Sequence, residues 1–372
     1  MFKVMNMKRK ALILSAALLM AGCSQPTYTT YSNMSLDSGF DTYFSLQAAT
    51  VKKEDFDELF TSSVNSFSHY NQLFDIYHNY DGVINLKTIN DNAGVTPISV
   101  DDDMMEMLVM AREMYELSDG EFDITLGAVL KIWHEYREDG LAQLENGQLG
   151  KVPDEEELKQ AKGCTGWQYV ELDEENNTVY INNPCVSLDV GGIAKGYTVE
   201  KISQQLQESQ VKMAIIDAGG NSKTINGKDD GSDWRIGIQN PDGSGSSLFV
   251  LTHNGTGSYV TSGDYQRYYV ADDGNIYHHI IDPATLFPAT YYHSVTILCE
   301  SSAYADGLST TLFTLPMDKG QEVIEQFNKA HPDFPASAIW VTDEPTDGEH
   351  SSYAEPYYVT YTADLEGKVV FK

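Results

Sequence analysis

The sequence predicts an α+β fold in which mixed, largely antiparallel sheets pack against helices in one large, two-lobed domain. Its 372 residues are 41% hydrophobic and 21% charged, a composition that supports a sizeable core and excludes a disordered or fibrous chain. Between residues 234 and 298, short apolar stretches alternate with turns, as is typical of antiparallel strands. Elsewhere strands and helices are mixed without the steady alternation that a parallel sheet requires, which favours α+β.

The first half of the domain is predicted to be rich in helix. Apolar residues recur at helical spacing over 54–73, and again over 101–117 in a helix capped near Ser99. A further helix follows the turn at 118–120 and continues through Tyr136, and a short acidic helix follows Pro153. Strands are expected at 40–51, at 168–172 and 178–182 around an Asn-Asn turn, and at 186–190.

The second half is predicted to be rich in strand. Two glycines at 191 and 192 interrupt the strand at 186–190 and lead into a helix that ends near Ser209. The remaining predicted strands are 211–216, 234–239, 247–253, 258–262, 267–271, 276–281, 293–298, 336–342 and 357–362, with helices at 303–314 and 318–330 and an acidic loop at 343–355.

The N-terminus has the pattern of a bacterial lipoprotein leader. A basic segment (Lys3, Lys8, Arg9 and Lys10) precedes an apolar stretch at 11–20 that is too short to span a bilayer, and small residues then precede Cys23. We therefore expect a signal peptide at 1–22, lipidation of Cys23, a polar tether at 23–38 and the folded domain at 39–372. This places the protein on the outer face of the bacterial cytoplasmic membrane; an ordinary signal peptide with an incidental cysteine is the alternative.

The charge of the chain restricts its partners. The formal net charge is −31, and removal of the four positive charges of the leader leaves −35. Such a chain should repel nucleic acid, which excludes nucleic-acid binding as its function. A polyanionic small ligand would need local compensation by a metal ion, a lysine or helix N-termini.

Three cysteines remain after the predicted lipidation site, at positions 164, 185 and 299. None of them has the spacing of a metal site. A disulfide between Cys164 and Cys185 is compatible with an extracytoplasmic protein, and buried free thiols are the alternative.

Two stretches carry the residue types expected of a metal and proton-transfer site. In the predicted helix at 303–314, Asp306 and Thr310 are four residues apart and should present two hard oxygens on one face, as Mg²⁺ prefers. Just upstream, His279 and Asp282 could orient or deprotonate a nucleophile. The alternative is a turn followed by a buried helix N-terminus with ordinary polar caps.

The turn at 189–196 is a candidate phosphate site. Asp189 precedes two glycines, and Lys195 falls in the first turn of the helix that follows. Glycines allow close backbone approach, and the helix N-terminus offers free N–H groups to an anion. A tight packing turn with a surface lysine is the alternative.

Six motifs together resemble one family, the ApbE-type flavin transferases, also called FAD:protein FMN transferases. They occur in the family order and cover roughly residues 39–342. The motifs are Ser-Asp-Gly-Glu-Phe-Asp at 118–123, Leu-Asp-Val-Gly-Gly-Ile-Ala-Lys-Gly-Tyr at 188–197, Ile-Asp-Ala-Gly-Gly-Asn at 216–221, Thr-Ser-Gly-Asp-Tyr at 261–265, His-Ile-Ile-Asp-Pro at 279–283 and Ala-Asp-Gly-Leu-Ser-Thr at 305–310.

The resemblance implies a domain related to the T-fold and a Mg²⁺-dependent enzyme. Such an enzyme cleaves the pyrophosphate of FAD, attaches FMN to a Thr or Ser hydroxyl of a target flavoprotein and releases AMP. By position, the FAD contacts would be Phe40, Glu121, Phe122, Asp123, Asp189, Lys195 and Ile280. The metal ligands would be Asp306, Thr310 and the carbonyl of Gly192, and we favour His279 over Asp282 as the base.

The sequence leaves two other functions open. With water as the acceptor, the same site would make an FAD pyrophosphatase, and without chemistry it would make an FAD-binding lipoprotein. A solute receptor of the periplasmic-binding type is disfavoured by the short antiparallel strands. The chain also departs from the family pattern after Asp282-Pro283, where the next turn (284–288) lacks the usual glycine and its easy access to positive φ.

Overall fold

The computed structural model describes residues 26–209, 211–346 and 350–371. The predicted leader and the lipidation site at Cys23 therefore lie outside the described residues. In the described part of the chain, no helix has the length and apolar character needed to cross a membrane.

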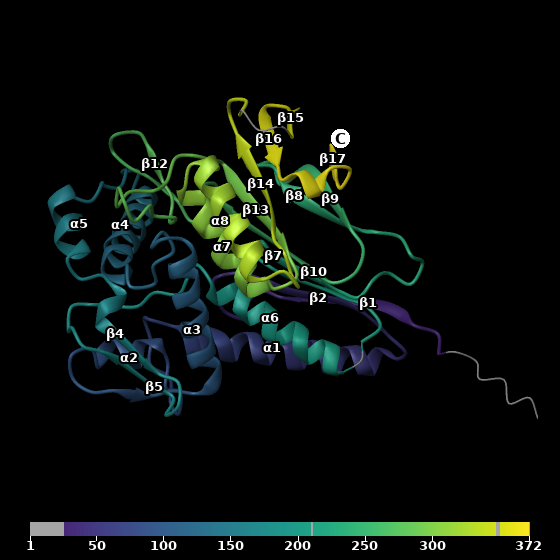
Figure 1. Ribbon diagram of the computed structural model, residues 1–372, viewed down its shortest axis with the longest axis horizontal. Coiled ribbons are helices and arrows are strands. Elements are labelled where there is room, and N and C mark those ends of the chain that lie inside the picture. The colour runs from purple at the N-terminus through teal and green to yellow at the C-terminus, as the bar shows by residue number, and fades with distance from the viewer. Residues whose placement is uncertain (1–25, 210, 347–349, 372) are drawn as a thin grey trace, which may run out of the picture.

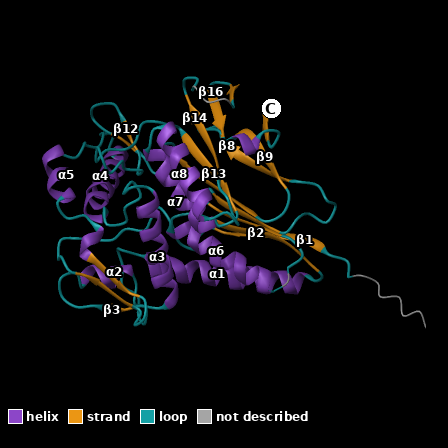
Figure 2. Ribbon diagram, in the orientation of Figure 1, coloured by secondary structure: helices purple, strands orange, loops and turns teal. Residues whose placement is uncertain are grey.

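A nine-stranded sheet forms the centre of the molecule (Figures 1 and 2). All neighbouring strands in it are antiparallel, which confirms the predicted α+β class. In spatial order they are β1 (Thr29–Ser35), β2 (Phe44–Thr50), β6 (Ala214–Ala218), β7 (Asn221–Ile225), β10 (Gly257–Gly263), β13 (Ser294–Cys299), β14 (Ser337–Thr342), β16 (Tyr357–Tyr361) and β15 (Ser351–Ala354).

The two faces of this sheet are covered differently. On one face lie α1 (Lys53–Phe74), α6 (Ala194–Glu208) and α7 (Ser302–Thr314), followed outward by α3 (Asp102–Leu117) and α8 (Met317–Ala330). The other face packs on a three-stranded sheet formed by β8 (Trp234–Gln239), β9 (Ser247–His253) and β17 (Val369–Phe371).

The period-2 alternation of strands explains how one strand serves both layers. In β13, Val295 and Ile297 belong to the core under the helices, whereas Leu298 belongs to the core under the three-stranded sheet. The strand is buried throughout although it contains the polar residues Ser294 and Thr296, which are buried as well.

A second, smaller part of the molecule lies beside the large sheet (Figure 1). It is formed mainly by the chain between α1 and α6, and a short hairpin from later in the sequence packs against its helix α4. Its elements are α2 (Leu86–Asp91), β3 (Ile98–Ser99), α4 (Gly127–Glu145), α5 (Glu155–Lys162), β4 (Val170–Asp173), β5 (Thr178–Ile181) and the hairpin β11 (Tyr269–Val270) and β12 (Ile276–Tyr277), with 3-10 turns at Trp167–Tyr169 here and Ala363–Leu365 near the C-terminus.

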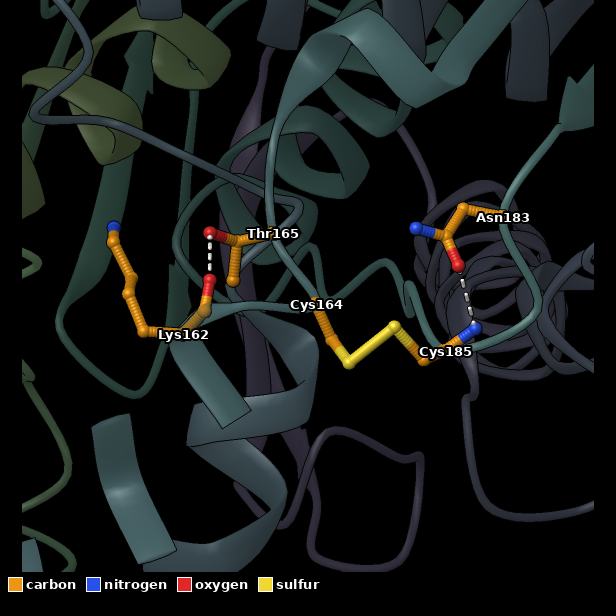
Figure 3. Close-up of a disulfide and its surroundings, with 5 residues drawn as sticks. All are labelled: Lys162, Cys164, Thr165, Asn183 and Cys185. Carbon is orange, nitrogen blue, oxygen red and sulfur yellow. Dashed lines mark hydrogen bonds between the residues drawn. A yellow bond between two sulfur atoms is a disulfide. The ribbon is translucent and has the colours of Figure 1, made fainter. Parts of the chain in front are cut away.

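A disulfide fastens this smaller part (Figure 3). Cys164 after α5 is bonded to Cys185 ahead of α6, and their Cα atoms are 5.3 Å apart. The pairing settles the alternative that the sequence left open, and Cys299 is a buried free thiol. The loop between Gly163 and Gly166 is thereby held beside the chain that leads to the glycine turn at 191–192.

Some local predictions need correction. Residues 351–354 of the expected acidic loop form the strand β15, which pairs with β16. Residues 29–35 of the expected tether form the edge strand β1, which pairs with β2 along its whole length. The cap of α3 is Asp101, which accepts a hydrogen bond from Met104 N, rather than a residue near Ser99. The expected strand at 186–190 makes a single bridge, Leu126–Ser187, because the Asn90 side chain and Ile124 O take the neighbouring backbone hydrogen bonds.

Candidate active site

A cleft of about 830 Å³ is lined by residues of both the smaller part and the large sheet. This is within the size range of sites for cofactor-sized ligands. The predicted residues that line it come from segments far apart in the sequence: Phe40, Glu121, Phe122, Asp123, Asp189, Gly192, Lys195, His279, Ile280, Asp306 and Thr310. Among the described residues, the lining includes all the predicted FAD, metal and base positions except Asp282.

The three predicted metal ligands converge between α6 and α7. Asp306 and Thr310 lie on successive turns of α7, as their spacing of four predicts. The Thr310 hydroxyl donates to Gly192 O over 3.5 Å, and Gly192 belongs to the turn that leads into α6. A carboxylate, a hydroxyl and a carbonyl therefore face one region of the cleft.

The carboxylate of Asp306 is held but not neutralised. Its Oδ2 accepts a hydrogen bond from Gly196 N at 2.8 Å, and its Oδ1 is 3.7 Å from Lys195 Nζ. Burial raises its pKa, while the charge of Lys195 and the Gly196 hydrogen bond oppose this rise. A second cation here would remove the cost of burying the carboxylate.

The buried side-chain amide of Asn221 lies beside Asp306 and is a further group that could contact a bound cation. Asn221, only 1% exposed, lies near Asp306 and favours its ionised form. Neither Asn221 Oδ1 nor Nδ2 makes a full hydrogen bond with any residue that the structure describes. Buried amides are rarely left unpaired. The oxygen-rich donors fit a hard divalent cation, although the described residues contain no cluster of three or more His, Cys, Asp or Glu able to bind a metal.

Glycines allow this close approach of α6 and α7. A Cβ on Gly196 would lie 2.3 Å from Ser302 O and 2.4 Å from Asp306 Cβ. A Cβ on Gly192 would lie 3.1 Å from the Phe122 ring and 3.3 Å from Thr310 Cγ2. In the same turn, Asp189 Oδ1 accepts a hydrogen bond from Gly191 N at 2.8 Å, and burial raises the pKa of this carboxyl.

The two histidines of the predicted site have different environments. His278 is buried, its Nε2 lies 2.9 Å from Ala289 O, and its Nδ1 accepts a hydrogen bond from Ile280 N. His279 faces the cleft, and its Nδ1 has no hydrogen-bond partner among the described residues. That nitrogen is itself buried, and no hydrogen bond holds the His279 ring to the described residues that surround it.

The pKa of His279 differs from the ordinary value of a histidine side chain, which lies near neutrality. Burial lowers this pKa well below 6.5, and the positive charges of Arg267, Lys195 and Arg137 lower it further. The imidazole is therefore neutral at neutral pH, which is the form that accepts a proton. A bound polyanion would offset the cationic neighbours and make the ring more basic.

Asp282 holds a turn instead of facing the ligand. Its Oδ1 accepts hydrogen bonds from Ala284 N at 2.7 Å and Thr285 N at 3.1 Å, and its side chain is buried. The turn that lacks the usual glycine places Leu286 at φ +67°, and Trp133 Nε1 donates to Leu286 O at 2.8 Å. The turn therefore still contains a residue at positive φ, but that residue is a leucine, which rarely adopts this conformation.

The segment at 121–123 is fixed by its neighbours. Phe122 N donates to Ser118 Oγ, and Asp123 Oδ1 accepts from both the backbone and the hydroxyl of Thr125. Thr125 in turn accepts from Gly166 N at 2.7 Å, which connects this part of the cleft to the loop held by the disulfide. Burial and the charge of Asp282 raise the pKa of Glu121 to about 6.

Several lining residues were not predicted from the sequence. Arg137 and Arg267 bring two positive charges to the cleft, and Arg267 donates to Phe40 O at 2.6 Å. Tyr77 and His134 also line it, with ring centroids 4.7 Å apart. The only sequence signal for any of them was the closeness of Arg267 to the Thr-Ser-Gly-Asp-Tyr motif.

The fold and the cleft together define a class: an α+β protein with a large cleft lined by aromatic rings, cationic side chains and hard oxygen donors. Lys195, Arg137 and Arg267 supply the local compensation that a phosphate-bearing ligand needs in so acidic a chain. The ApbE family pattern matches residues 40–332. This chain belongs to the ApbE family.

Individual relatives agree with this assignment. The chain is 33% identical over 241 residues to the FAD:protein FMN transferase of Klebsiella pneumoniae strain 342, which covers 64% of this chain and 70% of that protein. It is 34% identical over 256 residues to the protein of the same name from Treponema pallidum strain Nichols, which covers 65% and 68%.

Solved structures show the same fold. The ApbE protein of Thermotoga maritima has a TM-score of 0.68 at 28% identity, over 84% of this chain and 94% of that one. The flavin transferase ApbE of Vibrio cholerae has a TM-score of 0.70 at 21% identity, over 92% and 100%.

Proposed function

We propose that the protein is a Mg²⁺-dependent FAD:protein FMN transferase. It would move FMN from FAD to a Thr or Ser hydroxyl of a target flavoprotein and release AMP. The observation that carries this proposal is the single cleft in which the family motifs place Asp306, Thr310 and the Gly192 carbonyl beside Lys195 and the unpaired His279.

The residues of the cleft suit the parts of FAD. Phe40, Phe122 and Ile280 offer apolar surface for a flavin ring, and the Tyr77 ring offers a further stacking surface. Lys195, Arg137 and Arg267 offer positive charge to the pyrophosphate, together with the backbone N–H groups at the start of α6. The binding of FAD would thus depend on both sets of residues.

Asp306, Thr310 and Gly192 O would hold the cation, with Asn221 beside them. Bound Mg²⁺ supplies charge stabilisation to the pyrophosphate oxygens during phosphoryl transfer. Lys195 stays close to Asp306 and keeps a positive charge at the same end of the cleft. These groups are fixed by the backbone contacts of α6 and α7 before any ligand binds, as electrostatic catalysis requires.

His279 is the proposed base. The hydroxyl oxygen of the acceptor forms a bond to the phosphorus of the FMN half, and the bond from that phosphorus to the bridging oxygen breaks. The hydroxyl proton passes to a ring nitrogen of His279, and AMP leaves with the bridging oxygen. We do not include Asp282 in this step because its carboxylate already caps its own turn.

The decisive experiment is to incubate the protein with FAD, Mg²⁺ and a candidate acceptor domain and to measure the acceptor mass. A covalent FMN adduct is the expected result. FMN and AMP without an adduct would instead establish the FAD pyrophosphatase, and unchanged FAD would establish a binding protein. Asp306→Asn, which keeps the shape of the side chain but loses its charge, is the matched inactive control.

The same experiment identifies the base. We expect His279→Ala to lose transfer at least 100-fold while FAD still binds, because general-base catalysis contributes about that much. His278→Asn is the control for the neighbouring ring, and its loss should appear mainly as lower stability. Full transfer activity in His279→Ala would exclude His279 as the base.

We also propose that the protein is a lipoprotein anchored through Cys23 to the outer face of the cytoplasmic membrane. The supporting observation is the order of basic, apolar and small residues before Cys23. Replacement of Cys23 by Ser should release the protein from the membrane fraction. Unchanged membrane association in that variant would contradict the anchor.

A further inference from the structure

Helices α6 and α7 are joined by three polar contacts at a regular spacing. Thr310 Oγ1 donates to Gly192 O at 3.5 Å, Gly196 N donates to Asp306 Oδ2 at 2.8 Å, and Ser302 N donates to Glu200 Oε2 at 2.7 Å. From one contact to the next, the residue number rises by four on the α6 side (192, 196, 200) and falls by four on the α7 side (310, 306, 302). One turn of helix separates successive contacts, so they form a ladder along the interface of two antiparallel helices.

The ladder has two different ends. The contacts at Gly192–Thr310 and Gly196–Asp306 involve the three proposed metal ligands, and both lie at the cleft. The contact at Glu200–Ser302 lies beyond the cleft lining, two helical turns from Gly192. The position of the metal ligands along α7 therefore depends on where the start of this helix is held.

An ion pair between the buried Lys223 and Glu200, whose side chain is 18% exposed, holds the start of α7. Lys223 on β7 is 2% exposed, and its Nζ lies 2.7 Å from Glu200 Oε2 and 2.9 Å from Glu300 O. The Ser301 cap position of α7 supplies no side-chain hydrogen bond to the helix. Glu200 supplies that acceptor from α6 instead, and satisfies one of the free N–H groups of the helix end.

The same strand reaches the metal ligands directly. Side chains two residues apart on a strand point to the same face, so Asn221 and Lys223 both face the helices from β7. Asn221 lies by Asp306, and Lys223 lies at the start of the same helix. Strand β7 thus lies against α7 at two places, at the start of the helix and near Asp306 in the middle of the ladder.

A buried ion pair is an expensive way to stabilise a fold. Desolvation offsets most of the attraction, and a well-packed apolar pair of similar volume is often as stable. Unlike an apolar pair, the charged pair imposes a direction on the side chain, because Glu200 Oε2 has to face both the Lys223 ammonium and the Ser302 N–H. Its contribution is therefore to geometry more than to stability.

We infer that Glu200 and Lys223 are positioning residues of the active site. By fixing the start of α7 against α6, they set where Asp306 and Thr310 lie relative to the Gly192 carbonyl, and so determine the affinity for the divalent cation. The inference rests on the proposed function in that it takes Asp306, Thr310 and Gly192 as the cation site.

The test is Mn²⁺ binding to the full chain, measured by the loss of the free Mn²⁺ EPR signal, with and without FAD. We expect Lys223→Met and Glu200→Gln each to weaken Mn²⁺ binding about 10- to 100-fold, as losses of supporting groups around a metal site do. Lys201→Met is the matched control, because Lys201 is also on α6 but pairs with Asp103 and Glu106 on α3. It should change Mn²⁺ affinity less than twofold.

A double variant separates positioning from stability. Glu200→Leu combined with Lys223→Met replaces the pair by apolar residues, and should recover the thermal midpoint lost in Lys223→Met without recovering Mn²⁺ affinity. Recovery of both would mean that the pair acts only on stability and would overturn the inference. It would also be overturned by unchanged Mn²⁺ affinity in well-folded Glu200→Gln, with the proposed function intact. Failure of the unsubstituted protein to bind Mn²⁺ would instead remove the metal from the proposed function, and the inference with it.

Discussion

The wall of the cleft that carries Asp306 and Thr310 consists of two regular helices, whereas much of the remaining wall consists of loops in unusual backbone conformations. We call the first the helical wall (192–196 and 302–310) and the second the loop wall (39–41, 264–267 and 278–288), of which 39–41, 266–267 and 278–281 line the cleft. The loop wall holds Phe40, Asp41, Arg267 and Leu286 at positive φ. The other described non-glycine residues at positive φ are Asp119, Asn177 and Asn226, of types that tolerate this region far better than Phe, Arg or Leu.

This difference separates two ways of fixing a site. The helical wall places its groups by periodic hydrogen bonds and by glycines that let two helices meet. The loop wall places its groups by side-chain contacts across the sequence, such as Arg267 to Phe40 O and Trp133 to Leu286 O. Backbone strain concentrated at one wall is typical of a site that binds a ligand. The two walls should therefore fail in different ways when they are changed.

The largest effect is expected in the helical wall, from Gly196→Ala. The added Cβ would collide with Ser302 O and Asp306 Cβ, so α6 and α7 must separate. We expect a loss of about 1–3 kcal/mol in the free energy of unfolding and a loss of FMN transfer of at least 100-fold, since displacement of the ligands by about 1 Å has such effects.

Urea unfolding and the transfer assay measure the two losses. Gly163→Ala is the control, because Gly163 ends α5 at φ −61° and its Cβ would meet only Gln160 O, at 3.1 Å. Wild-type activity in Gly196→Ala would contradict the account of the helical wall.

The next effect is a pH dependence of the loop wall. His293 Nδ1 is 2.8 Å from Asp264 Oδ2 and its Nε2 is 3.0 Å from Asp343 Oδ1. The hydrogen bond to Asp264, and then that to Asp343, raises the pKa of His293 to about 9. Because the folded-state pKa is raised, the stabilisation is fully present below pH 6.5 and is lost as the pH rises through 9.

We expect this loss to be about 2 kcal/mol, a value reduced for the exposure of Asp343. Urea unfolding at pH 6.5 and 9.5 measures it, and His293→Gln should lack that part of the dependence. If the two proteins lose stability equally over this range, His293 is not charged in the fold.

A smaller effect tests the strain at Leu286. Replacement by Ala or by Gly removes the same buried side chain, but only Gly adopts φ +67° without strain. We expect Leu286→Ala to be less stable than Leu286→Gly by about 1 kcal/mol. At Leu206, which is buried within α6, the order should reverse because Gly is the weaker helix former. Denaturant unfolding of the four variants measures these differences. If the Ala variant is the more stable one at both positions, Leu286 is not strained.

The smallest effect concerns Glu121. Its pKa of about 6 arises from burial and then from the charge of Asp282, so ionisation of this carboxyl destabilises the fold as the pH rises from 4.5 to 6. We expect Glu121→Gln to be more stable than the unsubstituted protein at pH 8 by about 1 kcal/mol, and equally stable at pH 4. Thermal unfolding at both pH values tests this, and a variant that is less stable at pH 8 would contradict it.

The sequence predicted the helical wall better than the loop wall for a physical reason. Helical periodicity alone places Asp306 and Thr310 on one face, and the glycines before Lys195 indicate a close approach. Arg137 and Arg267 enter the cleft from a helix and a loop with no local pattern, so only the tertiary fold brings them there. Asp282 had the right chemistry for a base, but its use as a turn cap depends on backbone geometry that its neighbours decide.

The central sheet was predicted in its class and in most of its strands. In this sheet β7 was missed, β15 falls in the stretch predicted as an acidic loop, and β1 was taken for a tether because Thr, Ser, Tyr and Asn bury little in an edge strand. The residues of β1 have a strand periodicity too weak to be seen without their partner β2. Pairing across the sheet, which the sequence does not display, decides such segments.

The pairing of β1 has a consequence for where the enzyme can work. With Thr29 already in the sheet, only five residues separate it from Cys23, and the six residue steps between them extend at most about 20 Å. Under the proposed lipidation, the domain would be confined to a thin layer next to the bilayer. Acceptors embedded in the same membrane would meet it at a high effective concentration, whereas freely diffusing flavoproteins would not.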